Sequence, residues 1–485
     1  MVLSGLLLIP LLGLLLILAM PKTAASSIRK VAIAATALTF LLSVKVLLGF
    51  QPQLAAAQFE ERLPWIPQLN IAYHLGVDGL SMPMVLLTTL LALLACIASW
   101  SIKERHKEYY ILYLLLEVGM LGTFLSLDLF LFYIFWELVL VPMYFLIGIW
   151  GGGRREYSAF KFFVYTLAGS LFMLLGVLAL YFRAHTFDLI ALAQMGHTFD
   201  AGFQRLMFLA FFLGFAIKVP IFPFHTWLPD AHVDAPTPIS VLLAGVLLKM
   251  GGYGFFRISY PLFPDGAQWF STAMAVLGTI NIVYGAFVAM AQTDFKRLVA
   301  YSSVSHMGFV LLGLSSFTPE GVNGAMLQMF THGTITGGMF LLVGVLYDRA
   351  HTRALDAFGG LGAKLPKYAG FLTFFSLASL GLPGLSGFVA EFLSLVGTFP
   401  AHPAITAVAV LGIVVSAAYM LMVMQKVLLG PLNEKWKAMP DMKLSEIFVL
   451  VPLLLLVLGV GVYPLWVLRL QDAAIHALLA HISGS

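Results

Sequence analysis

Four side chains that can hold or release a proton stand inside long apolar runs of the sequence: Glu137, Lys218, Lys249 and Glu391. A charge at the centre of a bilayer costs at least about 2.5–3.5 kcal/mol, so such groups need a paired or wet surrounding. An opposite charge about 4 Å away changes proton affinity by about 4 kcal/mol at an effective dielectric near 20. A carboxylate that moves toward or away from a lysine can therefore make the lysine take up or release a proton. The alternative is that these charges are ion pairs that only hold helices together.

Histidines and a further carboxylate extend the set of candidates. His306 and His332 lie within apolar segments, and imidazole titrates near neutral pH, although a buried histidine is also often just a hydrogen-bonding residue. Glu117 is a secondary candidate inside another apolar run. His225 and His232 are also secondary candidates, for a structural role or for proton entry, because their spacing is a poor metal-binding signature.

The composition places these groups in lipid. Of the 485 residues, 60% are hydrophobic and only 10% are charged, and the mean hydropathy is +0.95. A soluble domain is about half apolar and a quarter charged, so no soluble core could hide this much apolar surface. The single cysteine, Cys96, cannot form an internal disulfide or ligate an iron–sulfur cluster with other cysteines.

Apolar runs of about 20 residues, the length that crosses a bilayer, predict an all-α polytopic membrane protein with about 14 transmembrane helices. We expect the spans at residues 3–20, 30–49, 80–100, 109–126, 128–149, 161–182, 206–224, 239–258, 269–291, 299–316, 322–347, 368–399, 404–426 and 446–467. Most of the 27 Lys and Arg residues fall in the loops that follow odd-numbered spans. Positive loops stay on the inner side of a membrane, so this alternation predicts that both chain ends lie on the outer side.

Two of the expected spans carry helix-breaking residues beside an ionisable side chain. Pro220 follows Lys218 in the seventh span, and Pro383 precedes Glu391 in the twelfth. Proline opens the helix ladder, and opened backbone at membrane depth is tolerated only where it is buried in protein or lines water. The breaks are five spans apart, which predicts two inverted five-helix repeats, spans 4–8 and 9–13, each with one interrupted helix. The single membrane domain, 1–485, would then comprise N-terminal spans 1–108, a first repeat 109–260, a second repeat 269–426 and a last span 427–485.

The segments that contain these residues resemble one known family. They are residues 135–151 around Glu137, 224–240 with His225 and His232, 248–254 with Lys249, 294–308 with His306, and 384–392 with Glu391. From about residue 70 to 430 the chain resembles the antiporter-like membrane subunits of bacterial complex I, the proton-pumping NADH:quinone oxidoreductase. The M type is favoured, because the sister L and N types tend to carry lysine at the position of Glu391.

The resemblance implies a function and a set of roles. Glu137 and Lys218 match the family's coupled pair, Lys249 its central lysine, and Glu391 its last residue toward the outer side. His306 and His332 match residues of its polar axis. Redox energy would arrive from partner subunits that hold NADH/FMN, iron–sulfur clusters and quinone, and this chain would carry no cofactor. Its partners would be lipid, protons and the L and N type subunits of a bacterial inner membrane, with no nucleic acid.

Three other functions are compatible with parts of the sequence. A D-type subunit of a multi-subunit Na⁺/H⁺ antiporter, or of a related hydrogenase or ferredoxin-linked complex, shares most of these motifs. A haem enzyme could use His306 and His332 as axial ligands, but the family pattern argues against it. A purely structural scaffold is disfavoured because it would not need four charges in the membrane.

Overall fold

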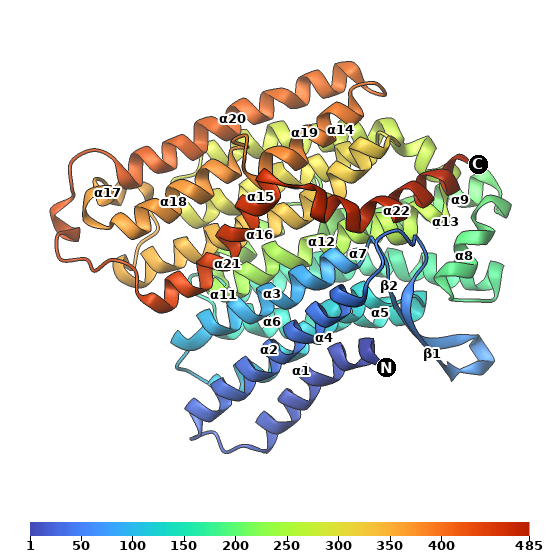
Figure 1. Ribbon diagram of the computed structural model, residues 1–485, viewed down its shortest axis with the longest axis horizontal. Coiled ribbons are helices and arrows are strands. Elements are labelled where there is room, and N and C mark those ends of the chain that lie inside the picture. The colour runs from blue at the N-terminus through green and yellow to red at the C-terminus, as the bar shows by residue number, and fades with distance from the viewer. Residues whose placement is uncertain (485) are drawn as a thin grey trace. The chain divides into compact units, whose positions relative to one another are not determined.

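The computed structural model describes residues 1–484 and is built mainly of helices (Figure 1). In that part of the chain, 13 helices are long and apolar enough to cross a membrane. They lie at the predicted positions, with ends displaced by a few residues. The remaining predicted span, 368–399, consists of two shorter helices, α18 (Pro366–Ser379) and α19 (Ser386–Thr398). The predicted all-α polytopic fold is thereby confirmed.

The chain divides into two compact units by its internal contacts. The first contains Met1–Val219, Val246–Ser271 and Arg469–Ser485. Its helices and strands are α1 (Val2–Ala19), α2 (Ala25–Gly49), β1 (Gln58–Ile66), β2 (Ile71–Val77), α3 (Met82–Ala98), α4 (His106–Leu125), α5 (Leu129–Leu138), α6 (Leu140–Trp150), α7 (Arg155–Ala184), α8 (Leu189–Met195), α9 (Ala201–Lys218), α12 (Leu248–Gly254) and α13 (Tyr260–Leu262). Helix α22 (Leu465–Ser483) lies almost entirely in this unit.

The second unit contains Pro220–Gly245 and Thr272–Leu468. Besides α18 and α19, it holds α10 (Trp227–Asp234), α11 (Thr237–Leu242), α15 (Phe295–Leu314), α16 (Pro319–Ala350), α17 (Leu361–Lys364), α20 (Pro403–Leu428) and α21 (Leu444–Val462). Helix α14 (Pro264–Met290) begins in the first unit and continues in the second.

A β-hairpin fills the longest connector, between the second and third spans, where the sequence had predicted no structure. Its strands β1 and β2 pair antiparallel, with Arg62 opposite His74. Glu61 accepts hydrogen bonds from the amides of Leu3 and Ser4, at 2.8 and 3.0 Å. A carboxylate at this position satisfies amides that the first turn of α1 leaves without intrahelical partners. The hairpin is thus attached to the start of the first span.

Aspartates fix the start of several helices. Asp128 accepts hydrogen bonds from the amides of Phe130 and Leu131 at the start of α5, and also from the amide of Ala72 on β2. Asp188 and Asp294 cap α8 and α15 in the same way. An N-cap carboxylate is worth about 1 kcal/mol. Asp128 therefore both begins a span and ties the hairpin to it.

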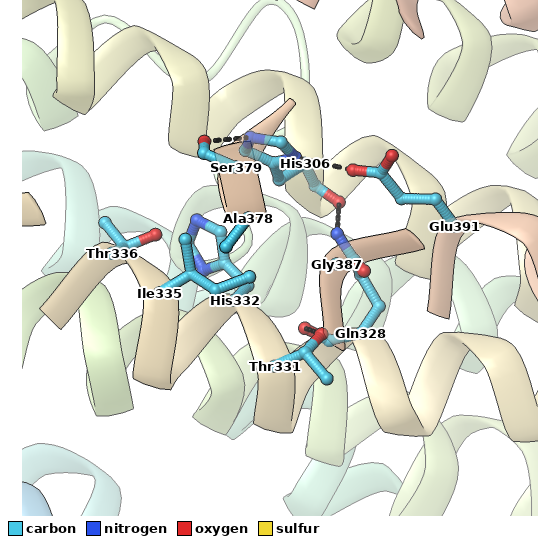
Figure 2. A pocket seen from close by; sticks show the side chains of 10 residues that line it. All are labelled: His306, Gln328, Thr331, His332, Ile335, Thr336, Ala378, Ser379, Gly387 and Glu391. Carbon is cyan, nitrogen blue, oxygen red and sulfur yellow. Dashed lines mark hydrogen bonds and ion pairs between the residues drawn. The ribbon is translucent and has the colours of Figure 1, made fainter. Parts of the chain in front are cut away.

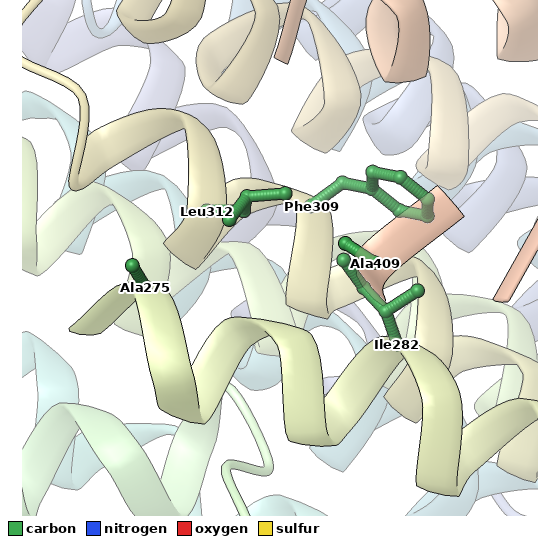
Figure 3. Close-up of a cluster of buried hydrophobic side chains, with 5 residues drawn as sticks. All are labelled: Ala275, Ile282, Phe309, Leu312 and Ala409. Atoms are coloured by element: carbon green, nitrogen blue, oxygen red, sulfur yellow. The ribbon is translucent and has the colours of Figure 1, made fainter. Parts of the chain in front are cut away.

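Close helix contacts in the second unit depend on small residues. A side chain on Gly308 of α15 would lie 2.6 Å from the carbonyl oxygen of Gly278 on α14. Small residues let membrane helices approach until their backbones touch. Around this crossing, α14, α15 and α20 enclose a buried cluster (Figure 3) of Ala275, Ile282, Phe309, Leu312 and Ala409. This packing holds α15, which carries one of the candidate histidines.

His74 forms the polar centre of the hairpin. Its side chain is only 1% exposed, and its ring nitrogens contact Asp188 at 3.1 Å and Glu60 at 3.0 Å. Burial lowers the pKa of His74, but the hydrogen bonds to these carboxylates outweigh it and leave the pKa raised. Burial likewise raises the pKa of Asp188, but the hydrogen bonds from His74 and the Ala191 amide, together with the charges of His74 and Arg62, outweigh it and leave the pKa lowered. A protonated His74 therefore ties the hairpin to the first turn of α8.

We predict that this tie is pH-dependent. A raised histidine pKa stabilises the fold below the ordinary value of about 6.5 and stops doing so as pH rises through the folded pKa. The contribution of Asp188 is present above about pH 3.9 and is lost only in stronger acid. Hydrogen-exchange protection of β2 amides should therefore be greater near pH 6 than near pH 8, and His74→Gln should remove the difference. His476→Gln is the control, because that side chain is exposed. An unchanged pH dependence in His74→Gln would contradict the prediction.

Candidate functional site

Lys218 is the last residue of α9 and is buried. Its ammonium group lies 5.3 Å from the centre of the Trp136 ring and 5.6 Å from that of Phe162. The negative faces of aromatic rings attract a cation, by about 2 kcal/mol where water is excluded. The charge of Glu137 also acts on Lys218. The structure thus brings together the first two predicted residues, with two aromatic rings that the sequence did not indicate.

Glu137 lies one residue before the end of α5, in a span that continues through Val139 into α6. Its Oε1 is buried and has no hydrogen-bond partner among the described residues. A buried oxygen without a partner carries a desolvation cost of about 1–3 kcal/mol, and more if it is charged. Glu137 is therefore not held by a hydrogen bond on that oxygen.

Lys249 is completely buried on α12, within the span Thr237–Leu262. Two π-helical turns, Leu243–Leu247 and Phe255–Ser259, lie before and after it. Such turns are rare and frequently occur at functional sites. A side chain on Gly251 would come within 2.9 Å of the Lys218 Cβ atom. The glycine thus lets α12 approach the end of α9, which brings the segment carrying Lys249 next to Lys218.

Glu117, a secondary candidate, is fully buried on α4. Neither of its carboxylate oxygens has a hydrogen-bond partner within residues 1–484. Burial of an unpaired charge is far more costly than burial of a neutral acid. The structure therefore places Glu117 in a buried position and does not join it to Glu137 or Lys218 by a hydrogen bond.

His306 and Glu391 form a direct hydrogen-bonded pair in the second unit (Figure 2). The distance from the His306 Nδ1 atom to the Glu391 Oε1 atom is 2.9 Å. On its other side, the His306 Nε2 atom lies 3.2 Å from the Ser379 hydroxyl. Both ring nitrogens of a histidine can thus exchange protons with neighbours here, and which one carries the proton depends on the tautomer. The sequence had predicted both residues but not their contact.

A small polar cavity adjoins this pair (Figure 2). It is lined by His306, His332, Glu391 and Ser379, together with Gln328, Thr331, Ile335, Thr336, Ala378 and Gly387. The His332 ring lies 5.7 Å from that of His306, measured between ring centres. Gln328 donates a hydrogen bond to the His306 carbonyl oxygen at 3.3 Å. Polar walls of this kind suit an ordered water, which would connect the two histidines.

The break between α18 and α19 positions Glu391. Gly381 and Gly384 have φ values of +82° and +93°, a left-handed conformation that glycine adopts without a steric penalty. A side chain at Gly381 would also lie 3.1 Å from the Glu391 Oε2 atom. The glycines therefore turn the chain and leave space for the carboxylate. The interruption predicted in the twelfth span is confirmed.

The interruption after Lys218 is held by an asparagine that the sequence analysis missed. Asn281 on α14 accepts a hydrogen bond from the Phe222 amide at 2.8 Å and donates one to the Pro220 carbonyl oxygen at 3.0 Å. Opened backbone in a membrane must find such partners, because water is absent. An asparagine in an apolar span is the signal that could have identified it.

His225 and His232 lie in the short segment after this break. The His225 Nε2 atom is 3.2 Å from the Tyr284 hydroxyl, and the His232 ring stacks on Phe340 with 4.6 Å between ring centres. Neither histidine is among the residues that line the His306 cavity. Both are buried, so the structure assigns them packing and hydrogen-bonding partners of their own.

The side chains present do not fit a metal centre. In residues 1–484, no group of three or more His, Cys, Asp or Glu side chains is arranged to hold an ion. Two sites, Glu137 with Lys218 in the first unit and His306 with Glu391 in the second, instead offer buried acids and bases beside interrupted helices. This combination of fold and sites defines an antiporter-like membrane subunit.

Comparisons with known proteins identify the family. The family described as "NADH:quinone oxidoreductase/Mrp antiporter, TM" matches residues 126–416. The chain is 48% identical to NADH-quinone oxidoreductase subunit M of Rhodobacter capsulatus, over 90% of this chain and 87% of that one. It is 41% identical to NADH-ubiquinone oxidoreductase chain 4 of Arabidopsis thaliana, over 99% and 97% of the two chains. The chain belongs to the family of M-type subunits of NADH-quinone oxidoreductase.

Solved structures agree with this assignment. A chain of respiratory complex I from Thermus thermophilus superposes with a TM-score of 0.90 at 34% identity, covering 99% of this chain and 100% of that one. A chain of the Mrp complex from Dietzia sp. DQ12-45-1b gives 0.87 at 22% identity, covering 98% and 97%. The second likeness is one of fold. Both neighbours are chains of larger complexes.

We predict that Gly387→Ala separates His306 from Glu391. The new Cβ atom would lie 2.2 Å from the Ala378 carbonyl oxygen, so α18 and α19 would have to move apart, at a cost of about 1–3 kcal/mol. The matched control is Gly370→Ala on α18, where nothing lies within 4 Å of the new atom. The expected result is a lower thermal unfolding temperature and impaired activity for Gly387→Ala only. Equal behaviour of the two variants would show that the contact at Gly387 is not needed.

Proposed function

We propose that this chain carries protons through the membrane as an antiporter-like subunit of a proton-pumping NADH:quinone oxidoreductase. The observation that carries the proposal is the hydrogen-bonded His306–Glu391 pair, buried beside a polar cavity at an interrupted helix. A purely structural ion pair would not need a second proton-exchanging contact on the imidazole, yet Ser379 supplies one. An acid and a base in contact can pass a proton between them without exposing it to lipid.

The first unit would act through the distance between Glu137 and Lys218. With Glu137 near, the ammonium form of Lys218 is stabilised by its counter-charge. With Glu137 withdrawn, only the Trp136 and Phe162 rings compensate the charge, and the lysine gives up its proton. A pair about 4 Å apart is worth about 4 kcal/mol at an effective dielectric near 20, which is enough to decide the charge state.

The proposed path is Glu137–Lys218–Lys249–His332–Glu391, with His306 beside Glu391 and water between the members. Lys249 would receive the proton from Lys218, because Gly251 allows their helices to approach closely. Two inverted repeats, spans 4–8 and 9–13, would supply one half of the path each. The matched interruptions after Lys218 and before Glu391 support this symmetry. Glu117, His225 and His232 would be secondary members, serving proton entry or helix contact.

The energy would come from partner subunits. The relatives are named as subunits of NADH-quinone oxidoreductase, so NADH/FMN, iron–sulfur clusters and quinone would be held elsewhere in the complex. The neighbours in the membrane would be the sister L and N type subunits. Reduction of quinone by NADH in those subunits would release the energy. The protein between those subunits and Glu137 would transmit this energy and move the Glu137 side chain.

We further propose a bacterial inner membrane as the location, with both chain ends on the outer side. The loops after odd-numbered spans hold most of the Lys and Arg residues, whereas the opposite side holds few: Arg62, Arg183, Arg205, Arg257 and Arg469. This asymmetry supports the orientation, because basic residues near span ends remain on the cytoplasmic side.

A second candidate function is favoured by one observation. The fold also matches a chain of an Mrp complex with a TM-score of 0.87. A D-type subunit of a multi-subunit Na⁺/H⁺ antiporter, or a subunit of a hydrogenase or ferredoxin-linked complex, would use the same acids and bases without NADH. The higher identity to the NADH-quinone oxidoreductase subunits favours the first proposal.

We predict that Glu137→Gln abolishes most proton pumping. The amide cannot carry the negative charge that stabilises protonated Lys218, so the lysine would no longer be loaded; the loss should be on the order of tenfold or more. The measurement is NADH-driven proton uptake in membrane vesicles that contain the complete complex, together with NADH:quinone turnover. Native gels establish that the variant complex assembles.

The matched control is Glu156→Gln, at an exposed position in the first turn of α7, which should pump normally. Normal pumping by assembled Glu137→Gln would mean that its charge is structural. If wild-type vesicles show proton exchange but no NADH activity, the antiporter function replaces the first proposal.

A further inference from the structure

A buried tyrosine stands next to the second site. Tyr419 on α20 is 0% exposed, and its hydroxyl has no well-formed hydrogen bond to any residue within 1–484. Burying a hydroxyl without a partner costs about 1–3 kcal/mol. A packing role would be served as well by phenylalanine, which carries no such penalty. The hydroxyl is therefore a feature that packing does not explain.

The groups that face this hydroxyl are polar and belong to the site. They are the hydroxyls of Ser302 and Ser416, and the carboxylate of Glu391, whose charge acts on the phenol. Ser302 precedes His306 by one helical turn on α15, and Ser416 precedes Tyr419 by nearly one turn on α20. Both serines are buried. Two helices, α15 and α20, thus carry the hydroxyl groups that lie near Tyr419 and the Glu391 carboxylate.

The proposed repeats give Tyr419 a counterpart. In the first repeat, Glu137, Lys218 and Lys249 occupy the second, fourth and fifth spans. In the second repeat, His306 and Glu391 occupy the second and fourth, and Tyr419 lies on the fifth. Tyr419 follows Glu391 by 28 residues, and Lys249 follows Lys218 by 31. On the proposed pairing of the repeats, the span that holds a lysine in one half holds a phenol in the other.

We propose that Tyr419 is a proton-relay residue of the second site, connecting the Glu391–His306 pair to the hydroxyls of Ser302 and Ser416. This inference rests on the proposed proton-carrying function. When Glu391 is ionised, the proton of the Tyr419 hydroxyl moves to it across a bridging water. In the same step, the phenol oxygen takes a proton from the hydroxyl of Ser302 or Ser416, and that serine takes a proton from a protonated water beyond it. The O–H bond of tyrosine is broken on one side and remade on the other, so the ring ends neutral and one proton has moved.

The Tyr419 hydroxyl can be removed without removing the buried ring. Tyr419→Phe removes only the hydroxyl and keeps the buried ring. We expect it to lower NADH-driven pumping and quinone reduction on the order of tenfold in assembled complex, and to enlarge the solvent deuterium isotope effect on turnover. A structural role would not change the isotope effect, because no proton transfer would have become slower.

Tyr368→Phe is the matched control. Tyr368 is a second buried tyrosine of this unit, on α18, and its hydroxyl donates to the Leu342 carbonyl oxygen at 3.3 Å. It should pump like the wild type with an unchanged isotope effect. Should Tyr419→Phe fail to assemble, the pair Ser302→Ala and Ser416→Ala removes the other end of the relay and is expected to give the same loss.

The outcomes separate this inference from the proposed function. Glu391→Gln is measured in the same vesicles. If Glu391→Gln loses pumping and assembled Tyr419→Phe retains it, the relay is overturned and the proposed function stands. If Glu391→Gln pumps normally, both are overturned. An equal loss in Tyr419→Phe and Tyr368→Phe, with an unchanged isotope effect, also overturns the relay.

Discussion

The structure depends above all on one constraint: backbone amides and carbonyls inside a membrane have no water to bind. Continuous helices satisfy it internally, but the two breaks need other partners. At the first, the Asn281 side chain binds both Pro220 and Phe222. At the second, left-handed glycines such as Gly381 let the chain turn back, so that its amides bond to the end of α18. These contacts fix the backbone at each break. They therefore also fix the positions of the residues beside the breaks, Lys218 and Glu391.

The energetic balance at Lys218 explains why its charge can change. Burial of a charge near the membrane centre costs at least about 2.5–3.5 kcal/mol. The two rings that face the ammonium group return about 2 kcal/mol each at best, so they roughly cancel the cost and leave no large surplus. A balance this close is sensitive to one additional charge. Under the proposed function, the position of Glu137 therefore decides whether Lys218 keeps its proton.

The apolar runs and the polar, Pro and Gly residues between them were enough to predict the spans, because lipid forces every crossing into a helix of similar length. The predicted interruption before Glu391 appears between α18 and α19 for the same reason. The hairpin was missed because Pro64 and the exposed Trp65 obscure the alternation of β1. Helix α22 was missed because charged and polar residues interrupt its apolar pattern, and it is not among the candidate spans.

The contacts of the sites could not be read from the sequence. Spacing shows that His306 and Glu391 lie on different helices, but only packing decides that they touch. Ser379 gave no signal, because a serine in a membrane helix usually bonds its own backbone. The aromatic rings around Lys218 were also invisible, since Trp136 and Phe162 come from separate spans. The sequence thus shows which ionisable residues lie within the spans, but it does not show which side chains they contact.

The two sites differ in the way their ionisable groups meet. His306 and Glu391 are in direct contact at 2.9 Å, a hydrogen bond that is stronger when one of the two groups is charged. Glu137 and Lys218 interact through space, and the Glu137 Oε1 atom is without a partner among the described residues. Under the proposed function, a movement that brings Glu137 to Lys218 would load the first site with a proton, and a movement that separates Glu391 from His306 would let the second site release one.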